Sequence, residues 1–115
     1  MAESDSRTSQ FRKGVVELAI LALLDAGELY GAEIVERLAV VKGLAVTSGT
    51  VYPLLSRLKK AGLVESVWRE SPVGPPRKYY RLSPAGRRDL AEMAHAWRGI
   101  SAAIDGLLLR VTTGD

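Results

Sequence analysis

Nine cationic side chains gather between positions 57 and 88 of this 115-residue chain, and only Glu65 and Glu70 oppose them. The segment therefore carries a formal charge of +7, and since the whole chain carries +3, the remainder carries −4. Charge concentrated on one part of a chain is typical of a surface that neutralises phosphates, so the sequence indicates a nucleic-acid-binding protein. The cations are Arg57, Lys59, Lys60, Arg69, Arg77, Lys78, Arg81, Arg87 and Arg88.

The composition argues against other classes of protein. The chain has no cysteine and a single histidine, His95, so no disulfide, metal cluster or nucleophile–histidine pair is expected, and no glycine-rich phosphate loop precedes a helix. We expect neither an enzyme nor a cofactor. The polar N-terminus does not resemble a secretory signal, and the longest apolar run, residues 15–24, is about half of a membrane span. We therefore expect a cytoplasmic protein with no membrane segment.

The elements that must hold the cations can be predicted from apolar spacing and from turn residues. Helices are expected over residues 11–26, from about 31 to 42, and from Thr47 or Ser48 to about 61. Strands over 63–70 and 78–82 flank a tip, residues 71–76, that contains three prolines. This predicts a mainly α protein with a small β-hairpin (α+β), a winged helix-turn-helix domain over residues 11–82. Residues 1–10 are expected to be a disordered leader.

The C-terminal part, residues 83–111, is predicted to be one long helix that forms a homodimer, followed by a tail over 112–115. Ser83 and Pro84 suit its N-cap and its first position. Apolar residues then follow a heptad, and a seam this regular is what a helix needs to pack along another helix. The expected dimerisation residues are Leu90, Met93, Trp97, Ile100, Ile104 and Leu107, with Val111 continuing the repeat and His95 on the exposed side.

Four motifs in a fixed order resemble the PadR family of bacterial transcriptional regulators. They are residues 29–34 (LYGAEI), 47–58 (TSGTVYPLLSRL), 62–64 (GLV) and 77–86 (RKYYRLSPAG), and the resemblance covers about residues 12–110. Because the chain ends after one long helix, it resembles the short second subfamily, which includes multidrug-sensing repressors. The resemblance implies a repressor that binds double-stranded DNA at a pseudo-palindromic operator.

The implied DNA-binding residues lie on the third helix and on the hairpin: Thr47, Ser48, Thr50, Tyr52, Arg57, Arg77, Lys78 and Tyr79. On the helix, Thr47 or Ser48 could instead only cap it, and Tyr52 could only pack. Lys59 and Lys60 suit a solvated helix end. Tyr79 and Tyr80 alternate, so one of them faces the core; the resemblance favours Tyr79 near DNA. Trp68 is expected to pack under the wing. The two prolines at the end of the tip lack backbone donors, which puts contacts from the tip in question.

The resemblance also implies that a small planar aromatic effector binds at the dimer seam, beside Trp97, Phe11, Val15, Leu18 and Met93. Heptad position alone favours Trp97 as a packing residue, whereas the small residues around it leave room for a ligand. Ala94 and Ser101 stand where a known drug binder has an aromatic and an acidic residue, so binding of cationic drugs does not carry over. Two rival functions remain: a helical interaction module without DNA binding, and a dedicated sensor of a metabolite or cofactor.

Overall fold

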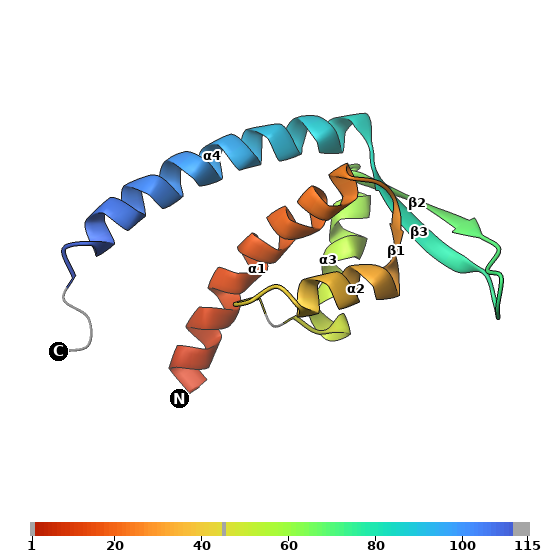
Figure 1. Cartoon of the computed structure of the whole chain (residues 1–115), viewed down its shortest axis with the longest axis horizontal. Helices are drawn as coiled ribbons and strands as arrows, with labels where there is room; N and C mark the ends of the chain where they lie inside the picture. Colours follow the sequence, from red (N-terminus) through yellow and green to blue (C-terminus); the bar gives the residue numbers. More distant parts are fainter. Residues whose placement is uncertain (1, 45, 112–115) are drawn as a thin grey trace.

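The computed structural model describes residues 2–44 and 46–111, with side chains from residue 13 onward. It is mainly helical with a small antiparallel sheet and a long C-terminal helix, as the sequence predicted (Figure 1). The elements are α1 (Ala2–Asp25), β1 (Leu29–Tyr30), α2 (Gly31–Ala39), α3 (Ser48–Lys60), β2 (Val64–Arg69), β3 (Arg77–Leu82) and α4 (Pro84–Leu108). The hairpin of β2 and β3 extends away from the three helices as the wing.

The sheet has three strands in the order β1-β3-β2, one more than the sequence predicted. Leu29 pairs with Tyr80 and Tyr30 with Tyr79, in the short stretch between the first two predicted helices, for which no strand was predicted. A strand of two residues is too short to show alternation, so the pattern of the sequence could not reveal it. The third strand ties the start of α2 to the wing.

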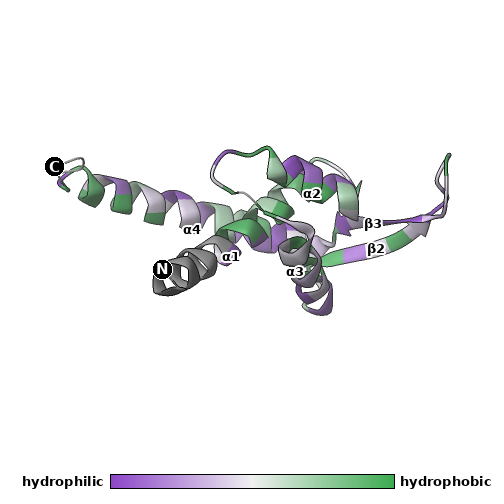
Figure 2. Ribbon diagram, turned by 90° about the horizontal axis from the view of Figure 1, so that it is seen from below, coloured by the Kyte–Doolittle hydropathy of each residue, from purple (hydrophilic) through white to green (hydrophobic). Residues whose placement is uncertain are grey.

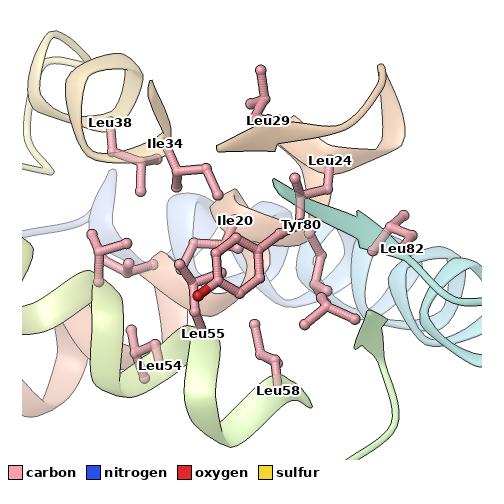
Figure 3. Packing of buried hydrophobic residues seen from close by; sticks show 14 of the residues in the cluster. Ile20, Leu24, Leu29, Ile34, Leu38, Leu54, Leu55, Leu58, Tyr80 and Leu82 are labelled. Atoms are coloured by element: carbon pink, nitrogen blue, oxygen red, sulfur yellow. The ribbon is translucent and has the colours of Figure 1, made fainter. Parts of the chain in front are cut away.

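The hydrophobic core lies where α1, α2 and α3 meet one face of the sheet (Figure 3). Along β3, Tyr80 and Leu82 are buried while Arg81 between them is exposed, as the period of two requires. Each fully buried Leu or Ile contributes about 1.5–3 kcal/mol through the removal of apolar surface from water. The fully buried side chains are Val16, Ile20, Leu21, Leu24, Ile34, Leu38, Val51, Leu55 and Val64.

The start of α4 is fixed by a compact set of hydrogen bonds around Ser83. Its hydroxyl accepts from the Gly86 N–H at 3.0 Å and donates to the Gly62 carbonyl at 2.6 Å, which confirms the predicted N-cap. The Ser83 N–H donates to the Leu63 carbonyl at 3.1 Å. A Cβ at Gly86 would lie 2.0 Å from the same Leu63 oxygen, so the close approach of α4 to this loop requires glycine. The direction in which α4 leaves the rest of the domain, α1 to β3, here called the head, is therefore set by backbone contacts.

Three helix boundaries differ from the prediction. Helix α1 begins at Ala2, not at residue 11, and residues 2–10 contain neither proline nor glycine to stop it. Helix α2 ends at Ala39 because two tight turns follow, in which Val41 N–H donates to Leu38 O and Leu44 N–H to Val41 O. Helix α4 ends at Leu108, so Val111 lies beyond it. The predicted tail, residues 112–115, lies outside the described residues.

Candidate nucleic-acid interface

The exposed face of α3 follows from its buried face. Val51, Leu54, Leu55 and Leu58 are buried, and with about 100° per residue the opposite direction carries a different set of residues. This set, here called the outer stripe, is Gly49, Pro53, Ser56 and Lys60, all of them exposed. The sequence prediction named none of the four as a DNA contact. A helical projection of the predicted third helix could have found them.

Ser48, Tyr52 and Lys59 lie beside the outer stripe, on the flank of α3 that faces α2. The Tyr52 ring lies against Gly31, where a Cβ would come within 2.6 Å of the ring atom Cε1, yet 42% of Tyr52 stays exposed. Tyr52 therefore both packs and faces solvent. Thr47 occupies the N-cap position, but its side chain makes no capping hydrogen bond, and its carbonyl accepts from the N–H groups of Thr50 and Val51.

Thr50 and Arg57 lie on the opposite flank of α3 and face α1. Arg57 forms an ion pair with Glu17 of α1, and Thr50 is half-buried. Both residues border a cleft of about 500 Å³ between α1 and α3, which Lys13 also lines. The structure thus brings Thr50 and Arg57 to the side of α3 that faces α1, where Gly49 and Pro53 of the outer stripe also border the cleft.

The register of the hairpin settles which tyrosine faces the core. Tyr80 lies in the core, where burial first, and then the neighbouring Tyr52, raise its pKa. Tyr79 is on the opposite face, edge-on to Tyr30 with ring centroids 5.5 Å apart. Arg77 shares the face of Tyr79, and its guanidinium lies 4.4 Å from the centroid of the Tyr30 ring. Lys78 points to the other face, so the two adjacent cations lie on opposite sides of the wing.

Trp68 does not pack under the wing as predicted, because 66% of it is exposed. It does lie on the core-facing side of the hairpin, since its register partner is Lys78 and the next pair inward is Ser66 and Tyr80. The core ends at Tyr80, and Trp68 lies beyond it, with the Lys78 ammonium 5.9 Å from its ring centroid. Trp68 thus points to the core-facing side of the strand, but the hairpin extends beyond the core at this position. For this reason the prediction that Trp68 packs was wrong.

Four of the nine cations between 57 and 88 are held by carboxylates. The pairs are Arg57 with Glu17, Arg69 with Glu28 at 2.6 Å, Arg81 with Glu65 at 3.1 Å, and Arg87 with Asp25 at 3.2 Å. Among the residues whose side chains the structure describes, no carboxylate pairs with the other five, which are Lys59, Lys60, Arg77, Lys78 and Arg88. Two of these five end α3 and two lie on the wing, which leaves their charges available to an external anion.

A second predicted site lies between α1 and α4, beside Trp97. A cleft of about 280 Å³ there is lined by Val15, Leu18, Met93, Trp97 and Ile100, with Gly14 and Ala96. On the other side of Trp97 a cleft of about 530 Å³ reaches Ala94, Leu90 and the Asp25–Arg87 pair. The structure therefore brings four of the five predicted effector residues together. The side chain of the fifth, Phe11, lies outside the described residues.

The predicted seam of α4 divides into two parts. Leu90 and Met93 are half-buried and pack against the core of the head. Trp97, Ile100, Ile104 and Leu107 are exposed in a single chain, with Trp97 at 43% the least exposed of them. Figure 2 shows hydrophobic residues recurring along α4 as far as its distal end. His95 is exposed, as predicted.

Among the described residues there is no cluster of three or more His, Cys, Asp or Glu side chains that could hold a metal ion. Likewise, no helix in the described ranges is long and apolar enough to cross a membrane.

Three helices packed on an antiparallel wing, with the outer stripe of α3 exposed, define a winged helix-turn-helix protein of the DNA-binding class. The chain belongs to the PadR-like family of transcriptional regulators, whose family profile matches residues 20–92. The resemblance inferred from the motifs is thereby confirmed, as is the expectation that the chain is not an enzyme.

Relatives agree in sequence and in structure. A transcriptional regulator of Mycobacterium tuberculosis is 35% identical over 97 residues, which cover 84% of this chain and 89% of the relative. The crystal structure of a PadR-like transcriptional regulator from Bacillus cereus is 35% identical, with a TM-score of 0.78 over 92% of this chain and 99% of that one. A PadR family regulator from Eggerthella lenta is 32% identical, with a TM-score of 0.78 and 96% of each chain covered.

Proposed function

We propose that the protein is a homodimeric transcriptional repressor that binds a pseudo-palindromic operator in the cytoplasm. The observation that carries this proposal is the placement of the cations left without a carboxylate partner in the described part of the chain. Lys59 and Lys60 end α3, and Arg77 and Lys78 lie on the wing. An α3 in the major groove with a wing on the adjacent backbone would use both sets of charges on phosphates.

The outer stripe supports a close approach of α3 to the groove. Gly49 and Pro53 have no side-chain donor or acceptor, so they allow the helix to come near the base edges without reading them. Ser48, Tyr52 and Ser56 supply the hydroxyl groups on or beside this stripe. Base reading would therefore rest on these three residues, while Lys60 and the wing cations set affinity.

Dimerisation through α4 is supported by its exposed apolar row, which continues the half-buried Leu90 and Met93. Covering Trp97, Ile100, Ile104 and Leu107 with the same residues of a second chain would remove this surface from water. Two identical heads then fit two half-sites, spaced by about one helical turn or by what the angle between the α4 helices allows.

Release from the operator is proposed to follow binding of a planar aromatic molecule beside Trp97. The clefts on both sides of this ring adjoin α1, and α1 also holds α3 through the Glu17–Arg57 pair. A ligand that changes the separation of α1 and α4 would favour head spacings that fit the operator poorly. In this respect the chain would act like the multidrug-sensing members of the short subfamily.

The test of the DNA-binding proposal is a genomic selection of fragments bound by the purified protein, repeated at several salt concentrations. A common inverted repeat and a steep loss of binding with salt are expected. The matched variants are Lys60→Ala on the outer stripe and Lys42→Ala, which removes a cation outside α3 and the wing. Lys60→Ala should lower the salt dependence by about one phosphate contact and Lys42→Ala should not. Absence of binding even in dilute salt would contradict the proposal and favour an interaction module.

The effector proposal has its own test. Titration with planar aromatic compounds should quench the emission of Trp97 and lower operator affinity, and Trp97→Ala should lose both responses. A broad panel of such compounds without effect on either signal would contradict it. A chromophore that co-purifies with the protein would instead favour a dedicated sensor.

A further inference from the structure

The core-facing side of the hairpin continues past the core as an aromatic–cation pair, in which Trp68 is exposed and Lys78 is half-buried. Three cross-strand pairs lie on this side: Val64 with Leu82, Ser66 with Tyr80, and Trp68 with Lys78. The first pair is buried, and the second brings Tyr80 into the core. The third pair stands beyond it, on the part of the wing that extends away from the helices (Figure 1).

This aromatic–cation pair is linked to α3 through Tyr80. The Lys78 ammonium lies 5.9 Å from the ring centroids of both Trp68 and Tyr80, so it is close to both rings. Tyr80 packs in the core with α3 and pairs with Leu29 of β1, and the partly exposed Tyr52 of α3 lies against Gly31 just after that strand. Trp68 and Lys78 therefore lie on the side of the sheet that packs against α3. A ligand bound along α3 and the wing would meet both of them.

The chemistry of the pair suits a nucleic-acid backbone. No carboxylate holds Lys78 within the described part of the chain, so its charge is available to a phosphate. The indole offers a flat apolar face and a single N–H, which can only donate a hydrogen bond. Deoxyribose provides apolar carbons and phosphate provides acceptors, in alternation along each strand. An indole next to a lysine can therefore contact a sugar while the lysine contacts the adjoining phosphate.

We propose that Trp68 contacts the sugar–phosphate backbone of duplex DNA beside the phosphate that Lys78 neutralises. The inference rests on the proposed DNA-binding function and adds a residue to it. Trp68 positions the wing and does not read bases, because contacts to sugar and phosphate carry no direct sequence information. Loss of the indole should therefore weaken binding by a similar factor on matched and mismatched operators.

Fluorescence can test the contact directly, because the chain has only two tryptophans, Trp68 and Trp97. Acrylamide is a suitable quencher since it is uncharged and leaves the ionic strength unchanged. Saturating duplex, recovered by the wild-type protein from a random pool, should protect the wild type from quenching. In Trp68→Phe, where Trp97 alone emits, the same duplex should give no protection. Anisotropy of labelled duplex shows that each protein is bound during the measurement.

Binding affinity gives an independent readout. Trp68→Ala should bind the duplex roughly threefold to tenfold more weakly, the range expected for one aromatic contact. Val67→Ala is the matched control, because Val67 lies on the same strand and points to the opposite face of the hairpin. It should bind as the wild type does. Circular dichroism establishes that both variants are folded, which is expected of Trp68→Ala since the ring lies outside the core.

The outcomes separate this inference from the proposed function. If the wild type binds duplex but DNA does not protect Trp68, or if Trp68→Ala binds as tightly as the wild type, the contact is overturned while DNA binding stands. If Trp68→Ala loses affinity only on some sequences, the residue reads bases and the proposed backbone role is overturned. If the wild type binds no duplex even in dilute salt, the proposed function itself fails.

Discussion

At the scale of single residues, Gly86 shows how the absence of one side chain allows α4 to approach its neighbouring loop closely. The Leu63 carbonyl oxygen lies 2.0 Å from the position that a Cβ of residue 86 would take, and it also accepts the hydrogen bond of Ser83 N–H. The clash would be with backbone, which cannot rotate away as a flexible side chain can. The glycine therefore allows α4 to begin directly against the loop that precedes β2.

Gly86→Ala should lower the free energy of unfolding by about 2–3 kcal/mol, because a small-to-large change in a tight site forces backbone shifts. Gly99→Ala is the matched control, since a Cβ at Gly99 meets nothing within 4 Å. That change should stabilise the helix by up to about 1 kcal/mol through helix propensity. Urea denaturation of the three proteins measures both effects. Equal stability of Gly86→Ala and the wild type would contradict the close contact.

At the scale of elements, the sequence predicted best the features that repeat over many residues. The heptad repeat of α4 and the apolar spacing of α1 and α3 predicted these helices, and the helices together with the hairpin predicted the winged helix-turn-helix class. The two-residue strand β1 and the exposure of Trp68 depend on tertiary pairing and on where the core ends, which local patterns do not record. The cation count likewise could not show that Glu17 holds Arg57, because the two residues are 40 positions apart.

The Glu17–Arg57 pair joins α1 to α3 and makes a prediction at this scale. Glu17→Gln should release Arg57 from its carboxylate and give it access to a DNA phosphate, so that affinity rises and the salt slope grows by about 0.9. Unfolding free energy should change by about 1 kcal/mol, because Arg57 is largely exposed to solvent, while the mostly buried Glu17 side chain is replaced by Gln of nearly the same size. Affinity measured across a salt series tests this.

Glu36→Gln is the matched control for that experiment, because it removes the same charge from the exposed surface of α2. It should raise affinity only through the net charge and leave the salt slope unchanged. The double variant Glu17→Gln with Arg57→Ala should lose the gain. If Glu17→Gln and Glu36→Gln behave alike, Arg57 does not reach a phosphate and the pair only joins the two helices.

At the scale of the whole molecule, the distribution of apolar surface separates a head from a stem. The head buries its core among α1, α2, α3 and the sheet, whereas α4 runs about 38 Å, calculated from its 25 residues at 1.5 Å each. The chain is elongated as a result, with extents of 55 × 32 × 22 Å. The distal part of α4 exposes Ile100, Ile104, Leu107 and Leu108, a surface that a folded head does not require (Figure 2). In the proposed dimer, this stem is the part of the molecule that a second chain would cover.

Ile104→Glu tests whether the stem joins two heads. A buried, unpaired carboxylate at the centre of a helical seam is strongly unfavourable, so the variant should be monomeric in analytical ultracentrifugation. Its heads should remain folded, because Ile104 is not part of the core. In the dimer, binding of one head holds the other head at a high effective concentration near the second half-site. A monomer lacks this effect, so operator affinity should fall on the order of 100-fold.

Ala102→Glu adds the same charge two residues earlier, about 200° around the helix from position 104, and is the matched control. Both variants repel DNA equally through the added charge, so a difference between them reports the seam alone. Ala102→Glu should stay dimeric and bind the operator nearly as the wild type does. A dimeric Ile104→Glu variant with unchanged affinity would show that the heads are joined elsewhere. In that case the exposed row on α4 would have another partner, and the spacing of operator half-sites would no longer follow from the angle between the two α4 helices.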